Sequence, residues 1–191
     1  MSFWRWAKGF QPKSPVLFGC NQCGECCREM QVPLNHQDLL RIYRQEPERP
    51  LLEWLQFRPV EKEHPEALWL DGVPGVLILR QRQGACVFLG EEQQCQLYSV
   101  RPRVCRIWPL EHCPGERALR VAPQHEMLVR LACDRTPVSV ETVAELQAEM
   151  DAIARDYRAY ALLLARWNAQ AREANTGHGL ADFVRFLSER M

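Results

Sequence analysis

The sequence reads Cys20-Asn21-Gln22-Cys23-Gly24-Glu25-Cys26-Cys27 near its start, and the rest of the chain is organised around this stretch. Its thiols follow the spacing C-x2-C-x2-C-C. A buried free cysteine acts as a small apolar side chain, but the residues between these thiols are polar or glycine and are typical of a loop. Gly24 tolerates the positive φ that a tight bend needs. The stretch therefore predicts a loop that wraps thiolates around a metal, and a disulfide knot is the alternative.

Length and charge limit the class of protein. The chain has 191 residues, enough for one domain with a core and an appendage, and its formal net charge is zero. This balance gives no electrostatic case for binding nucleic acid or an anionic membrane. No run approaches the ~18 apolar residues of a membrane span, and no secretory signal is visible. We therefore expect a cytoplasmic protein without a nucleic-acid partner or a membrane span.

The other cysteines lie far apart in the sequence. Nine cysteines in a compartment that keeps thiols reduced indicate metal binding or redox chemistry rather than a disulfide framework. We expect a site that links the loop to a sheet and to a short helix. The cysteines outside the loop are Cys86, Cys95, Cys105, Cys113 and Cys133.

The fold class is predicted as α+β: a small cysteine-rich domain of short antiparallel strands and helices, then a long helix and a short final helix. Asn35 is a good N-cap for a first helix, with the charge of Asp38 near its N-terminus. Leu34 and Leu39 occupy the positions of a hydrophobic staple. A second short helix is expected around residues 51–57.

Short apolar runs predict strands after this point. Residues 67–70 and 76–79 flank the turn formers of 71–75 and indicate a hairpin, and 86–89 is expected as a third strand. Pro102 suits the first turn of a short helix that carries Cys105 about one turn further along. Residues 127–133 are expected as a last strand that brings Cys133 back to the site.

An apolar stripe at helical spacing begins at Ser139 and continues for about 30 residues. It predicts one long helix, a turn at 175–179 and a final helix from Leu180. The expected organisation is an N-terminal arm (1–17), a metal-binding domain (18–135) and a helical extension packed on that domain (136–191). A helix that serves as an interface for a protein partner is the alternative.

The spacing of the thiols bears on the choice of metal. Zinc sites usually pair two C-x2–4-C units, and only one such unit occurs here. The C-x2-C-x2-C run matches the first three ligands of bacterial iron–sulfur loops, whose fourth cysteine comes from elsewhere. This favours an iron–sulfur cluster, with [4Fe–4S] the expected type, over zinc. Cys26 and Cys27 are adjacent and cannot easily both point at one small ion. One of them is therefore expected to face a second site, to lie behind the ligands or to act as a resolving thiol.

Taken together, these motifs resemble the YkgJ-like cysteine-cluster family, whose CxxCxxCC domain is described as chelating zinc or iron. The likeness covers roughly residues 18–135 and also includes Cys86-x-Phe88-Leu89 and Cys95-x2-Tyr98-x2-Arg101-Pro102-x2-Cys105-Arg106-x2-Pro109. Cys133 looks like a later family cysteine that usually precedes Pro-Gly, although in this sequence Cys113 is the cysteine followed by Pro-Gly. The resemblance implies the metal ligands Cys20, Cys23, Cys26, Cys27, Cys86, Cys95 and Cys105, with Cys133 as the further candidate.

The family includes flagellin lysine methylases whose cysteine domain holds an iron–sulfur cluster, which strengthens that interpretation. Arg101 and Arg106 match the family motif, which implies hydrogen bonds to the thiolates of a bound cofactor; plain ion pairing is the alternative. No S-adenosylmethionine-binding segment is evident. We therefore expect a metal-binding protein in electron transfer, metal handling or a structural role. The alternative is a redox enzyme, or a subunit of a protein-modifying enzyme related to those methylases.

Overall fold

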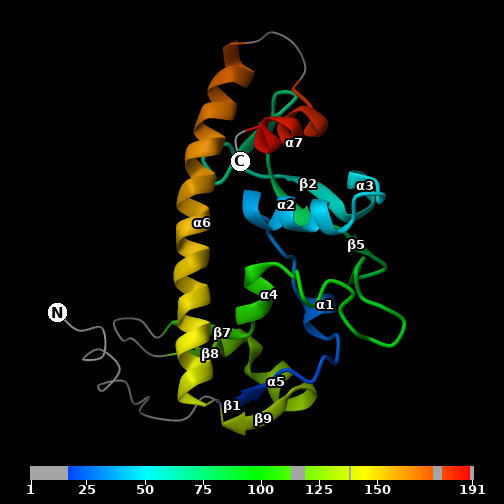
Figure 1. Cartoon of the computed structure of the whole chain (residues 1–191), viewed down its shortest axis with the longest axis vertical. Coiled ribbons are helices and arrows are strands. Elements are labelled where there is room, and N and C mark those ends of the chain that lie inside the picture. Colours follow the sequence, from blue (N-terminus) through cyan, green and yellow to red (C-terminus); the bar gives the residue numbers. More distant parts are fainter. Residues whose placement is uncertain (1–16, 113–118, 138, 174–177, 190–191) are drawn as a thin grey trace, which may run out of the picture.

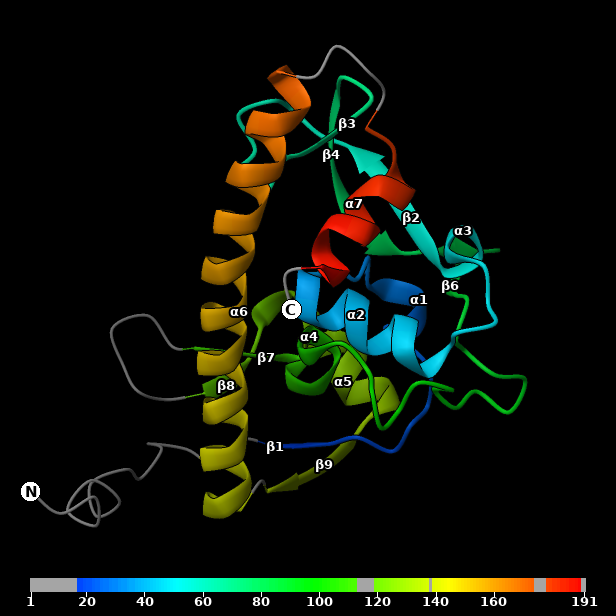
Figure 2. The ribbon, with the colours of Figure 1, turned by 45° about the horizontal axis from the view of Figure 1, so that its top comes forward.

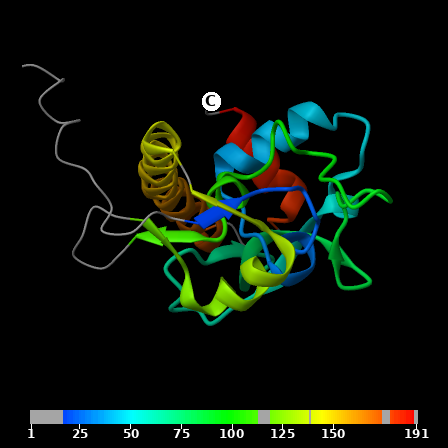
Figure 3. The ribbon, with the colours of Figure 1, turned by 90° about the horizontal axis from the view of Figure 1, so that it is seen from below.

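The long helix α6 (Val140–Glu173) runs along one side of the molecule, and the other elements lie beside it (Figure 1). The computed structural model describes residues 17–112, 119–137, 139–173 and 178–189. At 1.5 Å per residue, the 34 residues of α6 span about 51 Å. Seen from below, α6 is end-on at the edge of the fold (Figure 3). The single long helix expected from Ser139 is therefore confirmed.

The remaining elements are short helices and short antiparallel strands, so the α+β class is confirmed. In chain order, around α6, they are β1 (Leu17–Gly19), α1 (Cys26–Glu29), α2 (His36–Gln45), α3 (Leu51–Trp54), β2 (Leu55–Pro59), β3 (Leu68–Leu70), β4 (Val73–Leu79), β5 (Gln81–Arg82), β6 (Ala85–Cys86), α4 (Arg103–Ile107), β7 (Leu110–His112), β8 (Leu119–Val121), a 3₁₀ turn (Pro123–His125), α5 (Glu126–Ala132), β9 (Asp134–Pro137) and α7 (Leu180–Ser188).

A three-stranded antiparallel sheet in the order β2-β4-β3 forms one end of the fold (Figure 2). The expected hairpin is confirmed as β3 and β4, but its turn is tighter than expected, because Asp71 and Gly72 adopt φ angles of +47° and +80°. The helix expected over residues 51–57 is only partly confirmed. It ends at Trp54, and β2 follows and pairs with β4. The alternating polarity of Leu55-Gln56-Phe57-Arg58 suits a strand covered on one face.

The helix α2 begins as the sequence predicts. The Asn35 side-chain oxygen accepts hydrogen bonds from the backbone N–H of Gln37 at 2.9 Å and of Asp38 at 3.0 Å. Leu34 and Leu39 are buried on either side of this cap. The imidazole of His36 stacks on Tyr160 of α6 with a ring separation of 5.8 Å. Helix α2 thus packs against α6.

The main core includes apolar side chains from α2, from the sheet and from both C-terminal helices. Trp167 of α6 contacts Phe183 and Phe186 of α7 at ring separations of 5.2 and 5.3 Å. Its indole N–H donates to the carbonyl of Trp69 at 2.8 Å. A smaller core packs Val143 and other side chains of α6 against β7 and β8. The two cores place α6 against both ends of the fold, while the domain boundaries at residues 17 and 135 stay predictions.

Two further expected strands differ from the observed elements. The strand expected over residues 127–133 is wrong, because Glu126–Ala132 form the helix α5. The third strand is shorter than expected: β6 ends at Cys86, and Leu89 forms only an isolated bridge. Residues 1–16, Cys113 and most of the expected turn at 175–179 lie outside the described residues. In the part of the chain that the structure describes, no helix is both long and apolar enough to cross a membrane.

Candidate metal centre

The thiol-rich loop turns twice because two of its residues have positive φ angles, +59° at Gln22 and +78° at Gly24. A Cβ at Gly24 would lie 2.8 Å from the Gln93 carbonyl oxygen and 2.8 Å from the side chain of Leu89. Glycine is therefore needed for both the backbone conformation and the space. The chain then enters α1, which begins at Cys26. This close approach packs the loop against the segment that carries the next two cysteines.

That segment folds back on itself beside α1. A backbone bridge between Leu89 and Cys95 closes it, and the N–H of Gly90 donates to the carbonyl of Gln94 at 2.8 Å. Cys86 lies in β6, which contacts α1, and its side chain is buried. Cys86 and Cys95 are therefore held on the same side of the fold as the loop.

Cys105 lies on α4, one turn after Pro102, as the sequence predicts. Its N–H donates to the carbonyl of Pro102 at 2.9 Å. The arginines on either side hold α4 against α6. Arg103 donates to one carboxylate oxygen of Glu149 at 2.6 Å, and Arg106 donates to the other at 3.0 Å. The long helix thus fixes the position of a thiol that comes from a much shorter element.

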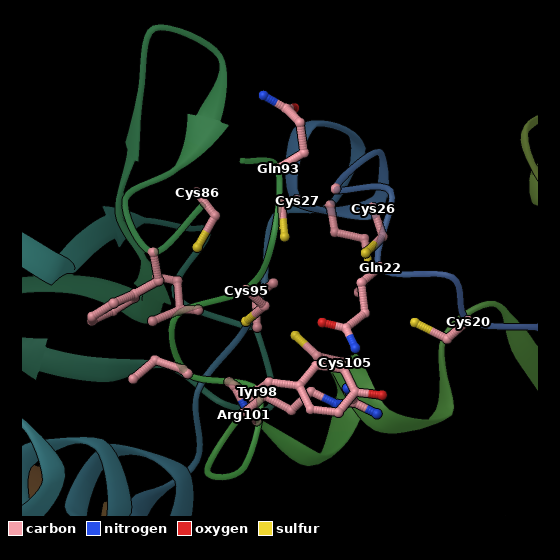
Figure 4. Close-up of a pocket in the computed structure, with 17 residues that line it drawn as sticks. Cys20, Gln22, Cys26, Cys27, Cys86, Gln93, Cys95, Tyr98, Arg101 and Cys105 are labelled. Atoms are coloured by element: carbon pink, nitrogen blue, oxygen red, sulfur yellow. The ribbon is translucent and has the colours of Figure 1, made fainter. Parts of the chain in front are cut away.

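Thiols from these segments line one cavity of about 60 Å³ (Figure 4). A single water needs ~10–15 Å³ measured in this way, so the cavity has room for more than one small atom or ion. Gln22, Gln93 and Tyr98 are also among the residues that line it. Tyr98 belongs to the family motif, but none of the three was predicted as a site residue. The cysteines that line it are Cys20, Cys26, Cys27, Cys86, Cys95 and Cys105.

Cys27 lies between two other thiols and hydrogen-bonds to both Cys26 and Cys95. The bond from Cys27 lowers the pKa of Cys95 to about 6 and that of Cys26 to about 7, and the positive charge of Arg101 acts in the same direction. The same two bonds raise the pKa of Cys27. The lowered pKa values of Cys95 and Cys26 raise their thiolate fractions near neutral pH, and the thiolate is the form that binds metals.

The deeper thiols have the opposite tendency. Burial raises the pKa of Cys86 to about 11. Burial also raises the pKa of Cys105, and the nearby thiols of Cys26, Cys86 and Cys95 add to the effect. Thiolates packed so closely repel one another. A bound cation would reverse this tendency because it stabilises a coordinating thiolate outright.

Cys133 reaches the loop from the end of α5 rather than from the expected strand. Its N–H donates to the carbonyl of Val129 at 3.2 Å and closes that helix. The side-chain N–H of Asn21 donates to the carbonyl of Ala132 at 2.8 Å, which ties the loop to this corner. The Cys133 thiol hydrogen-bonds to Cys23. Burial, followed by the charge of Cys23, raises the pKa of Cys133 to about 12.

The two candidate arginines have different surroundings. The Arg101 guanidinium lies 3.9 Å from the centre of the Tyr98 ring and lines the cavity. Its Nε is buried and has no hydrogen-bond partner among the described residues. Arg106 instead donates to the carbonyl of Arg101 at 3.2 Å and to Glu149. Arg101 thus lies close enough for its charge to act on Cys26 and Cys95, whereas the contacts of Arg106 are those of the ion-pairing alternative.

The thiols are neighbours around a cavity rather than a closed ligand shell. In the described residues, no three or more Cys, His, Asp or Glu side chains already form a compact set that could hold an ion. Cys20 is exposed, and Cys113 lies outside the described residues. The assignment of individual ligands therefore stays a prediction.

Helices and short strands packed around a thiol-lined cavity define a cysteine-cluster protein of the α+β class. The family model CxxCxxCC, described as "Putative zinc- or iron-chelating domain", matches residues 19–134. Because this is more than half of the chain, the chain belongs to this family, and the resemblance seen in the sequence is confirmed. No curated protein and no solved structure matches the chain.

Proposed function

We propose that the protein holds an iron–sulfur cluster on its thiols, with zinc as the second candidate. The donor set supports this proposal, because the side chains around the cavity that could bind metal are mainly cysteines. Thiolates are the usual ligands of iron–sulfur clusters and of structural zinc. The C-x2-C-x2-C spacing of Cys20, Cys23 and Cys26 favours the cluster over zinc.

The buried Nε of Arg101 carries the argument that the pocket suits an anionic metal–thiolate group. A buried N–H without a partner costs about 1–3 kcal/mol. A cluster or metal ion bound by several thiolates is negatively charged on its sulfur side, and N–H donors near such sulfurs stabilise it. Arg101 would supply both a positive charge and a hydrogen-bond donor there. We propose that Arg106 acts indirectly: it donates a hydrogen bond to the carbonyl of Arg101 and so helps to position that residue.

A bound iron–sulfur cluster would supply one-electron transfer, and zinc would supply structural stability. We infer a role in electron transfer, metal handling or structural support, in the cytoplasm where thiols stay reduced. The alternative, a redox enzyme or a subunit of a protein-modifying enzyme, gains support from the opening of the cavity. Tyr98 and Cys20 line the cavity and are both exposed, Tyr98 to 40%, so a partner or substrate could approach the thiols.

The test is the metal content of protein purified without oxygen. We expect iron and acid-labile sulfide in similar amounts, together with the broad absorption that thiolate-bound clusters share. Cys23→Ser and Cys105→Ser should each lower the metal content and the melting temperature, because binding free energy is also folding free energy in such sites. Cys113→Ser, the matched control, should do much less. Stoichiometric zinc without sulfide would contradict the iron–sulfur proposal and leave metal chelation intact.

A further inference from the structure

The thiols divide into two groups in space. In Figure 4 the sulfurs of Cys27, Cys86, Cys95 and Cys105 gather on one side of the cavity. The sulfurs of Cys20 and Cys26 lie on the other side, toward Gln22. The hydrogen bond between Cys27 and Cys95 lies within the first group. Cys26 hydrogen-bonds to Cys27 and its charge acts on Cys105, so Cys26 lies at the boundary between the two groups.

The start of α1 provides the division. Cys26 and Cys27 are the first two residues of this helix. Successive residues of a helix with 3.6 residues per turn project about 100° apart, so these two side chains diverge. Their hydrogen bond keeps the sulfurs adjacent. The two side chains therefore leave the helix in different directions and meet at their sulfurs, which places Cys26 and Cys27 at the boundary between two adjoining sites.

A second group surrounds the corner where the loop meets α5. The thiol of Cys133 hydrogen-bonds to Cys23, and its next thiol neighbours are Cys20 and Cys26. Asn21 holds this corner in place, because its side-chain oxygen accepts from the N–H of Cys23 at 3.2 Å while its N–H donates across to the end of α5. Cys23 and Cys133 are not among the described residues that line the cavity. These two thiols therefore lie outside that cavity, beside Cys20 and Cys26 at its edge.

We propose that the chain carries two four-thiolate metal sites that meet at α1. The outer site consists of Cys20, Cys23, Cys26 and Cys133, and the inner site consists of Cys27, Cys86, Cys95 and Cys105. This inference rests on the proposed metal-binding function and adds the number and composition of the sites.

The number of thiols supports two sites on chemical grounds. Tetrahedral zinc and the common iron–sulfur clusters each take four cysteine ligands. Eight thiols around one zinc or one cluster would leave half of them without a metal. The outer site joins the three-cysteine run to one remote cysteine, as iron–sulfur loops do. The inner site draws its ligands from α1, β6, the segment before Tyr98, and α4.

The charges nearby also fit two thiolate sites. The positive charge of Arg101 acts on Cys26 and on Cys95, one thiol of each site, so it lies near their shared wall. Arg49 lies 4.6 Å from the centre of the Phe88 ring, and its charge acts on Cys86 at the far end of the inner site. Cations at these two places would offset part of the negative charge that two thiolate sites accumulate.

The test counts the sites with Co²⁺, which reports thiolate coordination through its colour. Full-length protein, reduced and freed of metal without oxygen, is titrated with Co²⁺ while the thiolate-to-cobalt absorption is recorded. We expect the absorption to end at two equivalents for the wild type and for Cys113→Ser. Cys133→Ser and Cys105→Ser should each bind only one equivalent of Co²⁺ with the absorption of a four-thiolate site. Cys23→Ser and Cys95→Ser repeat the two arms if either variant fails to fold.

Each other outcome has a distinct meaning. An end point at one equivalent for the wild type overturns the second site while leaving chelation intact. Loss of all four-thiolate absorption in both Cys133→Ser and Cys105→Ser also overturns it, because the thiols would then form one unit. Two equivalents in a protein that carries no sulfide when purified would support two sites and contradict only the iron–sulfur assignment. No cobalt binding at all would contradict both proposals.

Discussion

Replacing Glu149 with glutamine tests whether the long helix fixes the position of the site. This carboxylate accepts one hydrogen bond from Arg103 and one from Arg106, on either side of Cys105. Burial raises the pKa of Glu149, but the hydrogen bond and charge of Arg103, with those of Arg106, outweigh burial and hold the pKa below its ordinary value. The ion pairs of Glu149 with the two arginines therefore stabilise the fold fully above about pH 4.5. Their contribution is lost as the pH falls through the lowered pKa of Glu149.

The size of the effect follows from these contacts. A hydrogen bond to a charged group stabilises a protein by about 1.5–3 kcal/mol. The side chains of Arg103, Arg106 and Glu149 are each about a quarter exposed, so solvent screening reduces this value. Arg103 also donates to Asp156 at 2.9 Å, and this partner is unchanged by the substitution. We therefore expect Glu149→Gln to lose about 1–2 kcal/mol. For a chain of this length, this lowers the melting temperature by roughly 2–8 °C.

Thermal unfolding measures the change in metal-free and in metal-loaded protein at neutral pH. Glu145→Gln, an exposed carboxylate on the same helix, is the matched control and should change stability by no more than about 0.5 kcal/mol. We also expect Glu149→Gln to weaken metal retention at Cys105, because α4 loses part of its support. Equal melting temperatures for the two variants would refute the idea that these ion pairs hold α4 in place.

Three further predictions use other parts of the fold. Gly24→Ala should lower the free energy of unfolding by about 2–5 kcal/mol and lower the metal content. The control Gly84→Ala, at a similar φ of +77° but with nothing within 4 Å of the added Cβ, should lower it by only about 1–2 kcal/mol. Equal losses for the two variants in chemical denaturation would show that the close packing of the loop is unimportant. Trp167→Ala should lower the free energy of unfolding by about 3–5 kcal/mol. The control Leu162→Ala, on the same helix but 67% exposed, should change it by no more than about 0.5 kcal/mol. A Trp167 variant as stable as the wild type would contradict the assignment of α6 to the core. Burial lowers the pKa of His36 below its ordinary 6.5, so the stability that the neutral imidazole contributes is present above that pH and is lost as the pH falls below it. Between about pH 7 and about pH 5, the free energy of unfolding of His36→Phe should therefore fall less than that of the wild type. Parallel pH profiles for the two proteins would contradict this.

Local signals in the sequence predicted the elements that depend on local physics. The Asn35 cap and the long apolar stripe of α6 each specify a helix without reference to the rest of the chain. The hairpin of β3 and β4 was predictable for the same reason, since its turn formers lie between two apolar runs. These elements depend on interactions between residues that are close in sequence.

The errors lie where distant residues decide the structure. The run from Met127 to Ala132 is short and apolar, and periodicity cannot separate a buried helix from a strand at that length. The polar strand β9 pairs with β1 more than a hundred residues away, so neither shows a local signal. In the site, the cysteines were evident from spacing, but the contact between Cys23 and Cys133 depends on the fold of α5. The ion pair of Arg106 likewise depends on Glu149, which belongs to α6.

X-ray absorption at the metal edge tests the central claim most directly, namely that thiolates hold the metal. The sample is full-length protein purified without oxygen, examined at the iron edge and at the zinc edge. We expect a first shell of sulfur alone, at about 2.3 Å if the metal is zinc. A first shell at about 2.0–2.1 Å, the distance of nitrogen or oxygen ligands to zinc, would contradict the account even if the metal were stoichiometric.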